Sequence, residues 1–398
     1  MSQLQFKSTD TIDWKEAFSN GSDGDAAVTT IHGSTGYGTA TFTGTSGNTY
    51  GTFLDRNYFN GSNGGRIGDI VLIHQTQGTG AGNWQLNKIV SRIGSTLNLK
   101  YALTHNYYTG CQIVSAGSYK NLTLSGSPSS WNGTWGGIVF AIAKTKITVS
   151  GTLSSTGRGF RGPTDLSYSM NGESAEKAWT GEGYTRNSIE SISANASGGA
   201  GGNGGDGGGG GGGGGHAATG TVGQAGQGST APGGSSCGNT ALTVMVSGGG
   251  GGSGKGESSA NCVSDRTYYA GLGGSSGGIV LLMSKKIVVS GSIACSGAAG
   301  ANAYGACEEG AGGGGGGSGG SILIKAEEAT LGTTKVVGTG GTGGAGNGGS
   351  HANGGAGSTG RIHLDYSKSY SGTTSPTINI TKDLTIKGKN GGGFFAFM

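Results

Sequence analysis

Proline is scarce in this sequence: the chain of 398 residues has 4 prolines, although it has 94 glycines. Collagen triplets need proline-like residues beside glycine, so the composition excludes a collagen-like triple helix. Charged residues are also few, at 12%, with a formal net charge of +4 and no cluster of lysine or arginine. We therefore expect no nucleic-acid partner. The longest apolar run, at 138–143, is far too short to span a bilayer, so no membrane insertion is expected.

The five cysteines are widely spaced and include no Cys-x-x-Cys pair, so they do not predict a zinc site. We expect them mainly as small buried hydrophobic residues. A Cys237–Cys262 or a Cys295–Cys307 disulfide stays open as an alternative, because spacing alone does not decide the pairing.

Signals for catalysis are weak. The histidines lack metal-ligand spacing, and His216, which follows a run of glycines, is expected to be a surface turn residue. The pattern Gly-x-Ser-x-Gly occurs at Ser236, Ser276 and Ser318, in Gly/Ser-rich sequence where chance matches are frequent. None of these serines sits on the strand-to-helix turn that exposes a catalytic serine. We expect no enzyme, no metal site and no cofactor.

The glycines recur with a period of three. Gly-Gly-x triplets begin at Gly198 and pass into uninterrupted glycine up to Gly215. Three residues per turn is the period of the extended polyproline-II-type helix, and glycine lets such helices approach closely while keeping its N–H. Further tracts lie at 247–256, 271–278, 310–321 and 338–360. We expect a packed polyglycine-II helix bundle, with a flexible Gly/Ser linker as the alternative. The expected scaffold positions are Gly198, Gly201, Gly204, Gly207, Gly210 and Gly213.

The first third of the chain predicts β structure in two regions. Residues 1–65 are polar and rich in turn residues, and we expect them to form an attachment region. Residues 66–130 predict a small β-barrel or sandwich, because short apolar strands follow one another at regular spacing. These strands are expected at 70–73, 84–90, 96–99, 111–114 and 122–124.

Two stretches of the chain repeat each other. Residues 137–157 align throughout with 278–297 once one residue is deleted, and weaker copies begin at Gly319 and Gly360. Each unit reads as a pair of strands followed by a glycine tract, which is typical of a solenoid-like array. The expected fold class is therefore all-β plus a polyglycine-II bundle, with a repeated body over 131–366.

The chain from residue 367 is expected to form a C-terminal hairpin, with strands at 377–380 and 384–386, and an apolar tail. Phe394, Phe395 and Phe397 lie in that tail. We expect them to dock on the chain itself or on a partner chain, because exposed apolar surface is unfavourable in water.

Binding is the activity that the sequence favours. Aromatic and arginine side chains on segments held by a rigid scaffold are typical of binding hot spots. The receptor-binding candidates between the glycine tracts are Trp179, Tyr184, Asp265, Arg266, Tyr268, Tyr269 and Tyr304.

The triplets at 198–206, 316–321 and 340–345 alternate with short variable segments. This pattern, over roughly Ser197 to Gly360, resembles the distal adhesins on the long tail fibres of T-even-like bacteriophages, whose tips are polyglycine-II sandwiches. The resemblance implies that segments 257–269 and 301–309 contact a host outer-membrane protein or glycan. It also implies partners among other virion tail proteins or copies of the chain. The repeated strand units look more like glycine-rich surface and structural proteins of bacteria.

The expected function is a non-enzymatic receptor-binding or tail-tip adhesin, attached to the virion through its N-terminal region. The N-terminus has no secretory signal, which fits a phage protein in the virion or outside the cell. The alternative is a structural subunit of a bacterial extracellular filament or sheath. An ice- or glycan-binding scaffold similar to glycine-rich antifreeze proteins would need a regular Thr or Ala face, and the x positions are too mixed for it.

Overall fold

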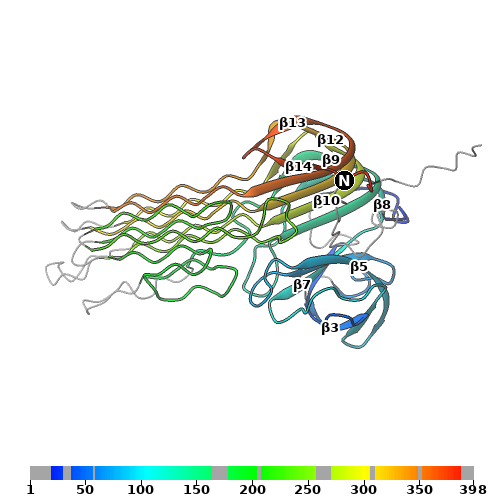
Figure 1. Cartoon of the computed structure of the whole chain (residues 1–398), viewed down its shortest axis with the longest axis horizontal. Coiled ribbons are helices and arrows are strands. Elements are labelled where there is room, and N and C mark those ends of the chain that lie inside the picture. Colours follow the sequence, from blue (N-terminus) through cyan, green and yellow to red (C-terminus); the bar gives the residue numbers. More distant parts are fainter. Residues whose placement is uncertain are drawn as a thin grey trace, which may run out of the picture.

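The computed structural model describes residues 19–29, 37–56, 59–163, 178–203, 208–226, 228–256, 270–304, 310–347 and 352–386. These residues form an all-β protein without helices, which confirms the expected all-β class. Figure 1 shows a small barrel, a curled sheet beside it, and long glycine-rich segments that run away from the sheet. Within the described ranges, no helix is long and apolar enough to cross a bilayer.

The barrel is closed and antiparallel, in the order β2-β3-β6-β5-β4-β7. Its interior holds apolar side chains such as Phe42, Ile73 and Ile113, which are almost fully buried. Burial of each such side chain contributes about 1.5–3 kcal/mol. The strands are β2 (Gly38–Thr43), β3 (Tyr50–Arg56), β4 (Ile70–Gln75), β5 (Trp84–Ile93), β6 (Thr96–Leu99) and β7 (Cys111–Ala116).

The predicted boundaries of the barrel were wrong, although four of its predicted strands are confirmed within β4–β7. β2 and β3, which fall in the expected attachment region, close the barrel. Without them β6 and β7 would each leave an unpaired edge, and closure removes these edges. β8 (Tyr119–Gly126), which contains the fifth predicted strand, belongs to the curled sheet instead.

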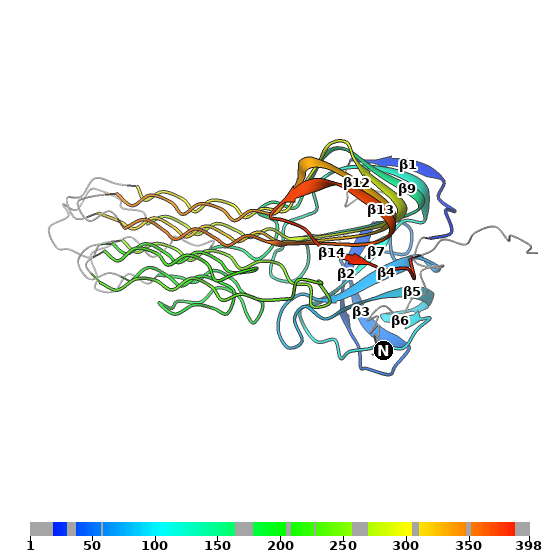
Figure 2. The ribbon, with the colours of Figure 1, turned by 45° about the horizontal axis from the view of Figure 1, so that its top comes forward.

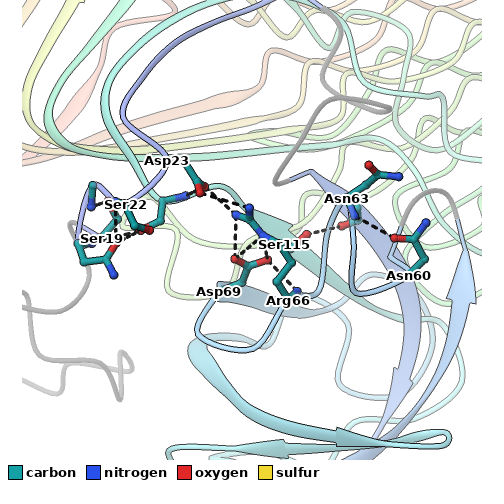
Figure 3. Close-up of polar contacts among 12 residues, drawn as sticks. Ser19, Ser22, Asp23, Asn60, Asn63, Arg66, Asp69 and Ser115 are labelled. Atoms are coloured by element: carbon teal, nitrogen blue, oxygen red, sulfur yellow. Dashed lines mark hydrogen bonds and ion pairs between the residues drawn. The ribbon is translucent and has the colours of Figure 1, made fainter.

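An ion network joins the N-terminal segment to the barrel (Figure 3). The Arg66 guanidinium lies 2.7 Å from Asp23 Oδ2 and 3.1 Å from Asp69 Oδ1. Burial raises the pKa of the Asp69 carboxyl to about 6, in spite of Arg66. Burial also opposes ionisation of Asp23, but the hydrogen bonds from Arg66 and from Ser118 N, together with the charge of Arg66, outweigh it and lower the pKa of Asp23. The network fixes the start of β1 (Asp25–Val28), which pairs in parallel with β8.

The curled sheet is a stack of parallel strands in the order β1-β8-β9-β10-β12-β13-β14, with the short β11 between β9 and β12. The strands of successive repeats align in phase, so that Ile279 lies opposite both Ile138 and Ser321. The one-residue deletion in the sequence alignment corresponds to a register shift between Ser284 and Lys286. The repeated strands are β9 (Ile138–Ser154), β10 (Ile279–Val289), β11 (Ser292–Ala294), β12 (Ser321–Val337) and β13 (Arg361–Ser375).

Each repeat forms one curved turn whose two ends meet. Ser155 Oγ, directly after β9, donates a hydrogen bond to Gly137 O at 3.4 Å, directly before β9. The expected strand pair is thus one long strand in β9 and β12. Inside the turn, alternating residues such as Leu282 and Ile324 form one apolar core. The residues between them, such as Leu281, pack outward against the barrel. The curl therefore has two cores, and one of them attaches it to the barrel.

The expected C-terminal hairpin is not present. β14 (Asn379–Lys382) pairs in parallel with β13, so it is a further strand at the edge of the stack. After it, Asp383 forms a turn in which its side chain accepts a hydrogen bond from Thr385 N at 2.9 Å. The turn directs Ile386 into the core beside the barrel, where it is fully buried. The residues expected to form the second hairpin strand, 384–386, are therefore held by burial of Ile386 and not by strand pairing.

The connections between β9 and β10, between β11 and β12, and between β12 and β13 form a unit that we call the glycine body (Figure 2). Its segments are extended and bond to one another through the main chain with a period of three. Gly211 N and Gly214 N, for example, donate to Gly313 O and Gly316 O, both at 2.9 Å. Segment 208–215 bonds in this way to 197–200, 221–224, Gly234, 249–255, 310–316 and 352–358. A segment with neighbours on every side has no room for side chains.

Candidate binding end of the glycine body

The glycine body has one end at the curled sheet and one end away from it, which we call the distal end (Figure 1). Segments that reach the distal end are tied together there through their main chains. Gly208 N donates to Gly310 O at 3.4 Å, and Ala311 and Asn347 exchange hydrogen bonds of 2.7 and 2.9 Å. The described residues that flank the connections at 204–207, 305–309 and 348–351 therefore lie in one group. Residues from distant parts of the sequence thus share one small surface.

Side-chain amides hold the distal end together. The Asn302 side-chain oxygen accepts from Ala345 N at 2.8 Å, and that of Asn353 accepts from Gly346 N at 3.0 Å. The Gln224 oxygen accepts from Asn353 N, also at 3.0 Å. All three amides are exposed. Because each uses its oxygen for the protein backbone, its NH₂ group faces solvent as a donor. Sequence reasoning missed these residues, and their position within two residues of a glycine in the glycine-rich half of the chain was the available signal.

Of the predicted receptor-binding residues, Tyr304 lies at the distal end, with 72% of its surface exposed. Asp265, Arg266, Tyr268 and Tyr269 fall outside the described residues, as do the scaffold positions Gly204 and Gly207 and the tail residues Phe394, Phe395 and Phe397. The other scaffold glycines, Gly198, Gly201, Gly210 and Gly213, all lie in close contact with neighbouring main chains.

Trp179 and Tyr184 are not brought together with Tyr304. Trp179 lies along the side of the glycine body, where its O accepts a hydrogen bond from Ser253 N at 2.8 Å. It lines a small cleft of about 250 Å³ with Arg161 and Pro163. Tyr184 lies beside the barrel, because its O accepts from Gly78 N at 2.8 Å. Trp179, Tyr184 and Tyr304 therefore lie at three separate places and do not form one site.

The cleft beside Trp179 contains a buried ion pair. Glu182 is 1% exposed and accepts hydrogen bonds from Arg161 N at 2.8 Å and Arg161 Nε at 3.0 Å. Glu182 O in turn accepts from Gly250 N of the glycine body at 3.0 Å. A buried carboxylate needs such partners, and Arg161 supplies them from both its main chain and its side chain. We assign a structural role to the ion pair between Arg161 and Glu182, because it fixes the side of the glycine body.

His216 is buried, whereas the sequence predicted a surface turn residue. It is 0% exposed and lies where the glycine body meets β12. Its Nδ1 lies 2.8 Å from Gly319 O, which can only accept, so Nδ1 carries the proton. Burial lowers the pKa of His216 to about 4. The prediction failed because glycine segments pack tightly enough to enclose a side chain at their end.

The described residues hold no group of three or more His, Cys, Asp or Glu side chains that could bind a metal ion. Cys111, Cys237 and Cys295 have free thiols, and the proposed partners Cys262 and Cys307 lie outside the described residues. Comparison with family models, with curated proteins and with solved structures finds no match to this chain.

Proposed function

We propose that the glycine body is a bundle of polyglycine-II helices, and that the protein is a non-enzymatic adhesin that presents the distal end to a cell surface. The observation that carries the proposal is the grouping of exposed residues from distant segments at one end of a tightly bonded scaffold. The partner is a protein or glycan of a bacterial surface, and the adhesin is part of a phage virion, as the resemblance to tail-fibre adhesins implies.

The hydrogen bonds of the glycine body support polyglycine-II helices. Segment 208–215 contacts different neighbours with successive residues, and returns to the same neighbour after three. That is the geometry expected of a helix with three residues per turn. A Cβ added at Gly211 would lie 2.6 Å from Ser253 O and closer still to Gly252 O. Glycine is therefore required by the packing, and flexibility does not explain its use here.

The distal end has the properties of a binding surface. A rigid scaffold holds loop residues in fixed positions, which lowers the entropy cost of binding. Tyrosine supplies a large contact area with few rotatable bonds, and exposed amides supply adaptable hydrogen bonds. Tyr304 and the amides of Asn302, Asn353 and Gln224 provide this combination.

The test is binding of the purified full-length chain to intact bacterial cells of several strains. We expect selective labelling of some strains by a discrete particle, and weaker labelling by a Tyr304→Ala variant. Tyr370→Ala is the matched control, because Tyr370 is also partly exposed but lies on β13. Equal labelling of all strains, or equal loss in both variants, would contradict the proposal.

A structural subunit of an extracellular filament is the second candidate, and one observation favours it. β14 pairs with β13 only from His363 to Tyr366, so the rest of that β13 edge has no neighbouring strand among the described residues. An unpaired edge is a template for pairing with another chain. Electron microscopy and sedimentation of the purified chain distinguish the two: filaments without strain selectivity support the subunit, and discrete particles support the adhesin.

A further inference from the structure

The barrel carries an open groove on its outer surface, with a volume of about 490 Å³. The end of β2 and the residues after it, 43–45, form the floor. Tyr50 and Thr52 of β3 lie on one side and residues 106–108 on the other. The floor is tied to that second side by two hydrogen bonds between Gly44 and Tyr107, of 2.8 and 3.0 Å. The groove is therefore built from adjacent paired segments.

The alternation of the strands directs polar side chains into the groove. Phe42 is buried in the barrel, so Thr43 faces outward. A Cβ on Gly51 would overlap the Phe42 ring, and one on Gly44 would overlap Leu103. Both glycines thus turn their missing side chains toward the interior, and the intervening positions face the groove. The outward residues are Thr43, Thr45, Tyr50 and Thr52, all of them exposed.

The groove is aromatic and polar but carries no ionic charge. Tyr50 is 51% exposed and Tyr108 is 46% exposed, so both rings are accessible to a ligand. The remaining lining residues supply hydroxyl, amide and backbone groups, and no Asp, Glu, Lys or Arg is among them. Such a surface offers flat apolar faces beside hydrogen-bond donors and acceptors. The groove offers no charged side chain that could pair with an ionic ligand.

The groove is preformed by hydrogen bonds beneath it and along its side. Tyr107 is 2% exposed and its hydroxyl donates to Gln85 Oε1 at 3.3 Å. Burial raises the pKa of Tyr107, so this hydroxyl keeps its proton. Tyr108 N donates to Gln75 Oε1 at 2.8 Å, and Asn106 Oδ1 accepts from Ser46 N at 2.9 Å. The Asn106 oxygen is thus occupied, and its NH₂ group is available to a ligand as a donor.

We propose that this groove binds an uncharged saccharide. The C–H face of a pyranose ring packs on an exposed tyrosine ring, while its hydroxyls bond to Thr43, Thr52 and Asn106. The volume is in the range of pockets for small organic ligands, which suits a short oligosaccharide. This site is separate from the distal end, because β2 and β3 lie at the opposite end of the molecule (Figure 2). The molecule would then bind ligands at two opposite ends, through the barrel groove and through the distal end of the glycine body.

The test is titration of the full-length chain with neutral gluco-, galacto- and manno-oligosaccharides, followed by calorimetry and by saturation-transfer NMR. Oligosaccharides that carry carboxylates or amines are the comparison. We expect at least one neutral sugar to bind, with at least tenfold loss in Tyr50→Ala or in Tyr108→Ala. Tyr50→Phe keeps the ring and should retain most of the affinity, which separates stacking from misfolding.

Tyr304→Ala is the matched control, and it should leave saccharide binding unchanged even if it weakens cell labelling. The two proposals can therefore fail independently. Absence of binding by every neutral sugar at millimolar concentration would overturn the inference. So would affinity that survives in both tyrosine-to-alanine variants, a preference for charged sugars, or a groove that binds a protein and no saccharide.

Discussion

Gly211→Ala tests the packing of the glycine body most directly. The alanine Cβ would lie 2.6 Å from Ser253 O and closer still to Gly252 O, so one segment must move away from the other. The bonds at risk join segment 249–255 to segment 208–215. They run from Gly249 N, Gly252 N and Lys255 N to carbonyls of 208–215, at 3.0, 2.9 and 2.8 Å.

The cost follows from these contacts. Each lost hydrogen bond costs about 1 kcal/mol net, and overpacking of a tight interior adds about 1–3 kcal/mol. We expect the opening of these two segments to become easier by at least about 4 kcal/mol, the lower end of this sum. Because about 1.4 kcal/mol corresponds to a factor of ten, exchange of their protected amides should accelerate by about three orders of magnitude.

Hydrogen–deuterium exchange by mass spectrometry measures this effect in the peptides that cover 208–215 and 247–256. The matched control is Gly338→Ala, where the nearest atom to an added Cβ is Pro376 Cδ at 3.8 Å. This substitution should change stability by less than about 1 kcal/mol, and in the stabilising direction, because alanine restricts the unfolded chain. If both variants exchange at the same rate, the reasoning that glycine is required by close approach is wrong.

Two further predictions concern titratable groups. The folded pKa of Asp69, about 6, lies above the usual aspartate value of 3.8, so the folded state binds the proton more tightly. Asp69 should therefore contribute stability that grows as the pH falls from about 6 to 4, by at most about 1.4 kcal/mol per pH unit, whereas His74 and His216, whose pKa values burial lowers to about 4, lose stability over the same range. Asp69→Asn should accordingly steepen the net loss of stability on acidification in urea unfolding measurements. Asp23 has a lowered pKa, so its contribution is lost only below this window. Burial raises the pKa of the Cys295 thiol to about 12. Cys295 should accordingly resist iodoacetamide at pH 8 in the folded state and react after unfolding, as followed by peptide mass spectrometry.

The repeats were the part of the fold that the sequence predicted best. Ile138 and Ile279 begin matching runs, and matching residues in parallel strands lie beside each other, so alignment alone predicts register. The all-β class and most of the barrel strands followed from short apolar runs and turn residues. These are local signals, and they need no knowledge of long-range contacts.

Features that depend on long-range contacts were missed. The alternation of Thr with Phe and Gly over 39–50 predicts an exposed strand pair, but nothing local shows that β2 and β3 close the barrel. The parallel pairing of β14 depends on burial of Ile386 beside the barrel. At the candidate sites, Tyr304 was predicted from its place between glycine tracts. Tyr50 and Tyr108 were not, because nothing local shows that their segments are neighbours.

The two ends of each curved turn lie close together, and this arrangement affects how the chain can change in length. Since Ser155 returns to Gly137, the glycine segments leave and re-enter the sheet at adjacent points. A segment of the glycine body can therefore gain or lose residues without altering the strands. Changes of three residues preserve the period of the hydrogen bonds between segments and add about 9 Å of extended chain. The length of the glycine body and the residues at its distal end are thus free to vary while the β core stays constant.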